Sequence, residues 1–237
     1  MTKFKRPSGR KLDEPRKIEA EAGVIKKADG SARFKIGDTE AYAAVYGPRD
    51  LHPKFLQNPK TGILRCNYSM MPFSGDGTRV RPGPSRRSKE ISMVTEKALT
   101  QVLDLKDYPN AVVDVFIELP QTDAGSRCAG ICAASIALAD AGIKMKDMIP
   151  AVSIGKIKDF LVVDLDGDEE HLDDNEAADI PIAMIPSTEE ITLLQMDGII
   201  SKKDLKDALK LVKPSLIKIA EVQRTALKKK YEVEGEK

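Results

Sequence analysis

The sequence predicts an α+β fold built from two similar, β-rich halves that meet near residue 150. In each half, stretches of strand length come first and helical patterns follow them, which is an order typical of α+β proteins. The last thirty or so residues predict a long amphipathic helical segment. We therefore expect two units, one formed by residues 1–150 and the other by residues 151–237.

Composition predicts a soluble globular protein. The chain has 237 residues, 41% of them apolar, and contains no apolar run long enough to cross a membrane. Its amino terminus is basic but lacks the apolar core of a secretory signal, so we expect a cytoplasmic protein without a membrane partner. The 38 basic and 37 acidic residues nearly cancel, so attraction to nucleic acid must come from local charge.

Cysteine spacing argues against both disulfides and a zinc site. Cys66, Cys128 and Cys132 are odd in number and form no CxxC pair. Cys128 and Cys132 lie four residues apart and share one face of a predicted helix. We expect them to be small buried residues, with metal binding as the less favoured alternative because no further ligand is close in sequence.

The first seventy residues predict a polar arm followed by short strands. A strand at Ile18–Ala20 closes the arm, and Gly37-Asp38 predicts a tight hairpin turn between Ser31–Ile36 and Thr39–Tyr46. Another strand is expected within Ile63–Phe73.

A loop is expected at 47–62, because three prolines interrupt that stretch. Its basic side chains, Arg49, His52, Lys54 and Lys60, either contact RNA or are ordinary solvated charges.

A helix is expected to begin after Ser85, a suitable N-cap, and to run to about Leu105 with apolar residues on one face. Arg86 and Arg87 fall in its first turn. Cations are unfavourable at the positive end of a helix dipole, so this placement favours guanidinium groups that bind phosphates, although solvated arginines are the alternative.

The strongest site signal is the stretch TDAGSRCAG at 122–130. It joins the best strand pattern, at 111–120, to the best buried-helix pattern, at 129–141. In a strand–turn–helix of this kind, free backbone N–H groups and the helix dipole converge on the turn, where Gly125, Ser126 and Arg127 lie. We interpret the turn as an anion site suited to phosphate. The alternative is a turn selected for close packing.

The second half predicts two pairs of strands and then the helical segment. The pairs are Ala151–Gly155 with Phe160–Leu165, and Pro181–Ile185 with Ile191–Met196. The segment at 201–230 is expected to form one or two amphipathic helices, with a break near Pro214.

Charge is concentrated in two stretches. Residues 79–89 carry five basic residues and no acid, and residues 164–179 carry nine acids and no Lys or Arg. Asp166–Glu170 does not fit a calcium loop, because Glu169 stands where that loop needs glycine, and we expect a solvated loop there. Asp179 differs because it adjoins the apolar run IPIAMI and should be partly buried. Either Asp173 or Asp174 could approach it across a turn.

These motifs, in this order, resemble the RNase PH family. The resemblance rests on RR-S-x-E at the start of a helix, D-A-G-S-R at the turn, A-D-x-P-x-A-M, and P-S-x-x-x-x-T-L-x-Q-x-D-G, and it covers nearly the whole chain. Within the family, the sequence is most similar to catalytic subunits of archaeal exosomes. The resemblance implies the RNase PH fold, with helices packed on mixed sheets and a long C-terminal helix.

The resemblance also implies roles for individual residues. Inorganic phosphate would bind at Gly125, Ser126 and Arg127, and RNA near its 3′ end at Arg86 and Arg87. Asp179 would be a metal ligand or general acid, with Asp173 as its partner in metal binding. Because DDNEAAD is one residue shorter than the usual family pattern, Asp174 remains an alternative to Asp173. His52 and Lys54 lie in HPKFLQNP, which resembles a loop that narrows the entrance to a central channel.

The implied activity is phosphorolysis of RNA from its 3′ end, with inorganic phosphate as co-substrate and Mg²⁺ or Mn²⁺ as the metal. Such enzymes release nucleoside 5′-diphosphates and can run in reverse, adding 3′ tails. The implied partners are the 3′ end of single-stranded RNA, a non-catalytic RNase-PH-like subunit in a hexameric ring, and RNA-binding cap subunits. The alternatives are a catalytically silent ring subunit that guides RNA, and a homohexameric enzyme that trims tRNA 3′ ends.

Overall fold

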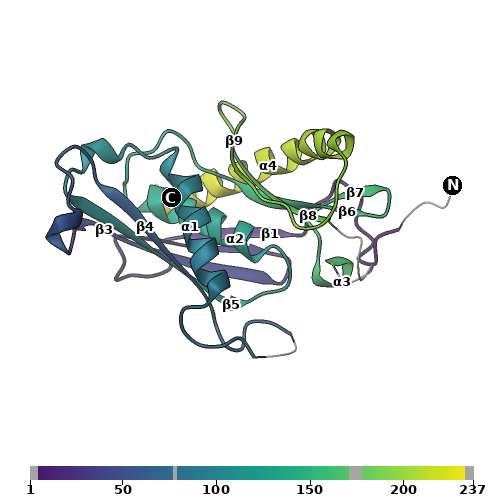
Figure 1. The fold of residues 1–237 in the computed structure, drawn as a ribbon, viewed down its shortest axis with the longest axis horizontal. Helices are drawn as coiled ribbons and strands as arrows, with labels where there is room; N and C mark the ends of the chain where they lie inside the picture. The colour runs from purple at the N-terminus through teal and green to yellow at the C-terminus, as the bar shows by residue number, and fades with distance from the viewer. Residues whose placement is uncertain (1–4, 77–78, 171–177, 233–237) are drawn as a thin grey trace, which may run out of the picture.

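The fold contains two β-sheets with helices packed against them (Figure 1). It is described here from a computed structural model, for residues 5–76, 79–170 and 178–232. The α+β class is confirmed, but the expected order of strands before helices is wrong. A helix at Arg86–Thr100 precedes the strand Ala111–Gln121, and a helix at Gly167–Glu170 precedes the strand Ala178–Ile185.

The first sheet has five strands in the order β1-β2-β3-β5-β4. Neighbouring strands are antiparallel except β4 and β5, which are parallel. The predicted hairpin is confirmed, because Ile36 pairs with Thr39 and Gly37 takes a φ of 57° at the turn. The bounds are β1 Ile18–Ala22, β2 Gly30–Ile36, β3 Thr39–Asp50, β4 Ile63–Met70 and β5 Ala111–Gln121.

The predicted start of the loop, at residue 47, is wrong. Arg49 pairs with Val112 and Asp50 with Ala111, so β3 continues beyond Gly47 despite a bulge in the pairing. The irregular part begins only after Asp50 and includes a short 3-10 helix at Lys54–Leu56.

Helix α1 (Arg86–Thr100) packs on β4. Its predicted start is confirmed, because the Ser85 hydroxyl accepts a hydrogen bond from the Ser88 backbone N–H. Its predicted end near Leu105 is wrong. The helix ends earlier because Val102 and Asp104 form backbone hydrogen bonds with the segment at 144–146. Val102 stays in the core.

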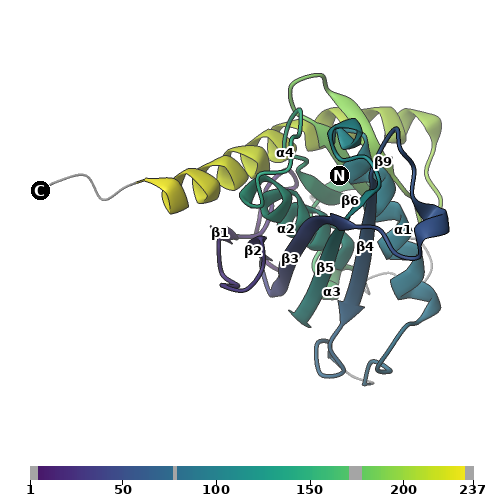
Figure 2. The same cartoon turned by 90° about the vertical axis from the view of Figure 1, so that its left-hand side faces the viewer.

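Helix α2 (Ser126–Asp140) contacts strands of both sheets (Figure 2). All of its residues except Arg127 and Ala139 are buried. Small residues allow this close packing. A Cβ atom on Gly130, for example, would lie 3.2 Å from the Ile117 side chain. Cys128 and Cys132 are buried on this helix, as predicted.

The second sheet has four strands in the order β7-β6-β8-β9 and is antiparallel throughout, so only the first sheet is mixed. Both predicted strand pairs are confirmed. The bounds are β6 Ala151–Ile157, β7 Phe160–Val163, β8 Ala178–Ile185 and β9 Glu190–Leu194. One hydrophobic core runs through both halves and includes α2.

The C-terminal helix α4 (Lys202–Tyr231) is continuous, so the predicted break near Pro214 does not occur. Proline cannot donate a hydrogen bond to the carbonyl four residues earlier, which belongs to Lys210. Pro214 and Lys210 both lie on the exposed side of α4, where water can satisfy that carbonyl. Among the described residues, no helix combines the length and apolarity that a membrane span requires.

The expected solvated loop at Asp166–Glu170 is also wrong. Residues Gly167–Glu170 form the short helix α3, and Glu169 is fully buried. Arg6 and Arg16, from the polar arm, are buried as well, at 2% and 8% exposure. Carboxylates and guanidiniums can be buried when they are paired, and here each pairs with a partner from a distant part of the sequence.

Candidate active site

A cleft of about 470 Å³ lies where the N-terminus of α2 faces the second sheet. Its walls come from α1, α2, the start of β8 and the segment after β9. Polar side chains and turn residues dominate the lining, among them Arg87, Glu90, Gly125, Ser126, Arg127, Asp179, Gln195 and Asp197. The turn and the Asp179 carboxylate, which are far apart in the sequence, therefore open into one cavity.

The turn has the geometry expected of an anion site. Gly125 is the N-cap of α2 and has left-handed dihedral angles, with φ 69° and ψ 26°, which glycine adopts without strain. No side chain caps α2 within the described part of the chain. The N–H groups of the first helical turn, beginning at Ser126, thus remain available to a bound anion at the positive end of the helix dipole.

Tyr68 holds the Ser126 hydroxyl. The Tyr68 Oη donates to Ser126 Oγ over 2.9 Å, and both residues are buried. Burial raises the pKa of Tyr68, which keeps its phenol protonated and therefore a donor. Because Ser126 Oγ accepts this bond, its own hydrogen is free to be donated to an anion at the turn.

Arg127 is held by residues from two other elements. Its guanidinium donates to Oε1 of Gln195, and the Gln195 amide donates to Glu90 Oε1 over 2.8 Å. The Glu90 carboxylate also lies 3.9 Å from Arg127 Nη1. These contacts fix the side chain of Arg127 at the cleft without using all five of its N–H donors.

Asp179 is largely buried, as predicted from its apolar neighbours. Burial raises its pKa, and the Arg127 cation, the Ser153 hydroxyl and the Arg87 cation only partly oppose this effect. Its Oδ1 is buried and has no hydrogen-bond partner among the described residues. Asp179 also exchanges two backbone hydrogen bonds of 2.9 Å with Asp197, which brings a second carboxylate to the cleft.

The donor chemistry of these two carboxylates suits a divalent cation. Magnesium and manganese prefer oxygen ligands, and an unpartnered buried carboxylate oxygen is the kind of atom that a cation satisfies. The described residues contain no cluster of three or more metal-ligating side chains. Asp173 and Asp174, the two candidates for the third carboxylate, lie outside the described residues.

The predicted RNA-binding residues occupy different places. Arg87 lines the cleft, whereas Arg86 is exposed beside it and is not part of the lining. His52 and Lys54 are exposed in the loop after β3. Backbone bonds tie that loop to residues 105–110, beyond the C-terminal end of α1 (Figure 1). The cleft is lined instead by Arg87 and Glu90, near the N-terminal end of α1.

Sequence reasoning assigned no role to several residues that line the cleft or support it. Glu90, Gln195 and Asp197 stand within the motifs RR-S-x-E and Q-x-D-G, so a signal for them was present. Asp123 precedes the turn and lines the cleft too. Tyr68 has no local signal, because its partner Ser126 is 58 residues away.

Comparisons with known proteins give a consistent assignment. Models of the 3′ exoribonuclease family match residues 14–144 as domain 1 and residues 147–213 as domain 2. The exosome complex component Rrp41 of Thermococcus gammatolerans is 50% identical over 96% of this chain and 90% of its own length. The component of the same name from Methanopyrus kandleri is 47% identical over 95% of this chain and 93% of its own length.

Solved structures share the fold. Rice Rrp46 superposes with a TM-score of 0.83 at 24% identity, covering 94% of this chain and all of that one. A chain of the Archaeoglobus fulgidus exosome with RNA bound to the active site superposes with a TM-score of 0.79 at 24% identity, covering 92% of each chain. With both domain models matched in order and half of the residues shared with an archaeal relative, the chain belongs to the RNase PH family of 3′ exoribonucleases.

Proposed function

We propose that this chain is the catalytic subunit of an exosome ring and degrades RNA from its 3′ end by phosphorolysis. Inorganic phosphate attacks the terminal phosphodiester, the bond to the preceding 3′-oxygen breaks, and a nucleoside 5′-diphosphate is released. The observation that carries the proposal is the single cleft that contains an uncapped helix N-terminus, two arginines and a buried carboxylate.

We assign binding of the attacking phosphate to the turn. Gly125 and Ser126 supply backbone and hydroxyl donors, and Arg127 supplies a cation. An anionic nucleophile that approaches an anionic diester needs this kind of preorganised positive field. Tyr68 and Gln195 support the assignment because they fix Ser126 and Arg127 before any ligand binds.

We assign to Asp179 the role of stabilising the leaving 3′-oxygen. A carboxyl group whose pKa is raised by burial is suited to donate a proton to that oxygen. Alternatively, Asp179 acts as a deprotonated metal ligand, together with Asp197 and with Asp173 or Asp174. A bound Mg²⁺ or Mn²⁺ would supply positive charge to stabilise the developing oxyanion.

We assign RNA binding to the basic side chains outside the turn. Arg87, in the cleft, and Arg86, beside it, would hold phosphates near the 3′ end, while His52 and Lys54 would contact RNA further along the strand. Such a path for single-stranded RNA would run from one end of α1 to the other. Its length is roughly 22 Å, at 1.5 Å per helical residue.

The ring assignment rests on the relatives, which are named exosome components. We propose that the chain alternates with a non-catalytic RNase-PH-like subunit in a cytoplasmic hexamer capped by RNA-binding subunits. The reverse reaction, in which nucleoside diphosphates extend a 3′ end, follows from microscopic reversibility at the same site.

A test uses a 5′-labelled single-stranded RNA and Mg²⁺, with and without inorganic phosphate. The chain is assayed alone and with its candidate ring partner. Stepwise shortening that requires phosphate supports the proposal. Retained RNA binding without shortening in either preparation would support a silent, RNA-guiding subunit, and full activity of a homohexamer on tRNA ends would support the trimming enzyme.

A further inference from the structure

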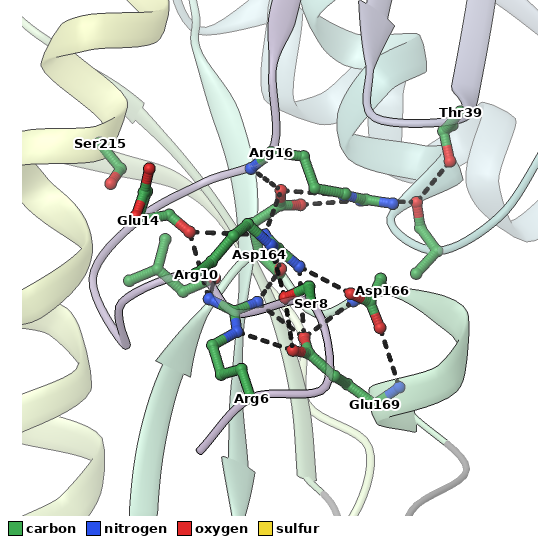
Figure 3. Close-up of polar contacts among 12 residues, drawn as sticks. Arg6, Ser8, Arg10, Glu14, Arg16, Thr39, Asp164, Asp166, Glu169 and Ser215 are labelled. Carbon is green, nitrogen blue, oxygen red and sulfur yellow. Dashed lines mark hydrogen bonds and ion pairs between the residues drawn. The ribbon is translucent and has the colours of Figure 1, made fainter.

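A buried ion cluster joins the N-terminal arm to the end of β7 and to α3 (Figure 3). We call it the arm cluster; its members are Arg6, Arg10, Arg16, Asp164, Asp166 and Glu169. Arg6 donates to both oxygens of Glu169, over 2.7 and 2.6 Å, and both side chains are fully buried. Buried charges of opposite sign in such geometry hold their segments in one arrangement, because each would be costly to leave unpaired.

Arg16 differs from the other arginines of the cluster because it also reaches the active site. Its Nε and Nη2 donate to the two oxygens of Asp164 over 2.9 and 2.8 Å. On its other side, Nη1 donates to Asp123 Oδ2 over 2.7 Å, and Nη2 donates to the Ala124 carbonyl over 3.1 Å. Asp123 and Ala124 are the two residues immediately before Gly125.

Further contacts of the same two residues complete this support. Thr39 Oγ1 donates to the Ala124 carbonyl over 2.7 Å and accepts from the Asp123 N–H over 3.1 Å. Asp123 Oδ1 accepts from the Gly167 N–H of α3 over 2.8 Å. The entry to the turn is therefore held by side chains and backbone from both halves of the chain.

The fold also provides space for Arg16 in this position. A Cβ atom on Gly37, in the β2–β3 turn, would lie 2.4 Å from Arg16 Cδ. A Cβ atom on Gly125 would lie 3.4 Å from Arg16 Nη2, which shows how closely the guanidinium lies behind the turn.

We propose that Arg16 is a positioning residue for phosphate: it fixes the Asp123–Gly125 backbone so that the donors of Ser126 and Arg127 point at the attacking phosphate. This inference rests on the proposed function of the turn. Arg16 itself is buried behind the turn and is not assigned a contact with substrate. Its planar fork can bond Asp164 and the turn at once, which the point charge of a lysine cannot do.

The test compares Arg16→Lys with Arg10→Lys in the full-length chain, assayed with its ring partner if the pair is required for activity. Arg10 is a matched control because it belongs to the same cluster, bonding Asp166 over 2.8 Å and the Asp164 carbonyl over 3.0 Å. Within the described residues, its hydrogen bonds and ion pairs do not extend to Asp123 or Ala124. A third variant, Asp123→Asn, removes the charge on the turn side and leaves the Arg16–Asp164 pair in place.

Three quantities are measured for each variant: the KM for inorganic phosphate, the Kd for RNA, and amide hydrogen exchange at residues 123–128. We expect Arg16→Lys and Asp123→Asn to raise the phosphate KM roughly tenfold, because small displacements of positioned groups weaken binding strongly. Exchange at 123–128 should rise as well, while the RNA Kd changes less than twofold. Arg10→Lys should lower thermal stability without either effect.

An unchanged phosphate KM and unchanged exchange in folded Arg16→Lys would overturn the inference, as would equal changes in Arg10→Lys. Hydrogen exchange does not depend on activity, so it distinguishes the two possible failures. If the unaltered chain shows no phosphorolysis, the proposed function fails, and the exchange at 123–128 still decides whether Arg16 positions the turn.

Discussion

The guanidinium of Arg127 donates a hydrogen bond to the side-chain oxygen of Gln195, which comes from the segment after β9. This contact crosses the cleft from α2 to the second sheet. Gln195 also donates to Glu90 of α1, so one amide links the proposed phosphate ligand to both neighbouring walls.

Replacing Gln195 with glutamate should weaken phosphate binding. The new carboxylate would pair with Arg127 and compete with phosphate for it, and it would also repel Glu90. We expect the phosphate KM to rise about tenfold, equivalent to about 1.4 kcal/mol, with RNA affinity little changed. Steady-state kinetics at varied phosphate measure this. Gln101→Glu is the matched control, because Gln101 is exposed and bonds the Thr192 carbonyl outside the cleft.

Replacing Asp179 with asparagine should abolish turnover and leave RNA binding nearly intact. Asparagine preserves the shape of the side chain but cannot donate a proton as a carboxylic acid does, and it is a weaker metal ligand. Single-turnover assays and RNA-binding titrations on the same preparation separate the two effects. Equal loss of turnover and RNA binding would argue against the role assigned to Asp179.

The same substitution should change stability in a pH-dependent way. Because burial raises the pKa of Asp179, the folded protein holds this proton more tightly than the unfolded chain does. At a pH well below the unfolded-state pKa of about 3.9, Asp179 is protonated in both the folded and the unfolded state, so its charge does not lower the stability of the folded state. Above the folded pKa, the folded state must bury a carboxylate, and this cost is fully present.

Asp179→Asn should therefore raise the melting temperature by a few degrees at pH 7–8, and the gain should shrink as the pH falls through the folded pKa toward the unfolded one. Thermal melts in EDTA, with phosphate absent, measure this without ligand effects. A gain that stayed constant down to acid pH would show that the charge of Asp179 is not its cause.

The two arginines of α1 should contribute unequally to RNA binding. The double change Arg86→Ala with Arg87→Ala should weaken RNA binding and flatten its salt dependence, because each phosphate contact releases counterions. Since only Arg87 lines the cleft, Arg87→Ala alone should account for most of the loss. Titrations at several salt concentrations test this. Unchanged binding in the double variant would indicate a structural role for both residues.

Local patterns predicted the parts of the fold that depend on neighbours in sequence. Three features illustrate this: the hairpin at Gly37-Asp38, the N-cap at Ser85 and the uncapped turn at Gly125. Each follows from residues that are only a few positions apart in the sequence. The same patterns placed Asp179 next to apolar residues and so predicted its partial burial.

Long-range pairing accounts for the buried charges that the sequence did not predict. Glu169 lies among acids and looked solvated, but its partner Arg6 is 163 residues away. Arg16 looked like one charge in a polar arm, although Asp164 and Asp123 fix it behind the turn from 148 and 107 residues away. Periodicity and turn chemistry carry no information about such pairs, which form only when the two halves pack together.

The most direct test of the central claim follows isotopically labelled inorganic phosphate into the products of RNA degradation. In phosphorolysis the attacking phosphate becomes the β-phosphate of each released nucleotide. We predict nucleoside 5′-diphosphates with the label at the β-position, and loss of that product in Asp179→Asn. Release of unlabelled nucleoside monophosphates would show that water is the nucleophile and would contradict the assignment of phosphate to Gly125, Ser126 and Arg127.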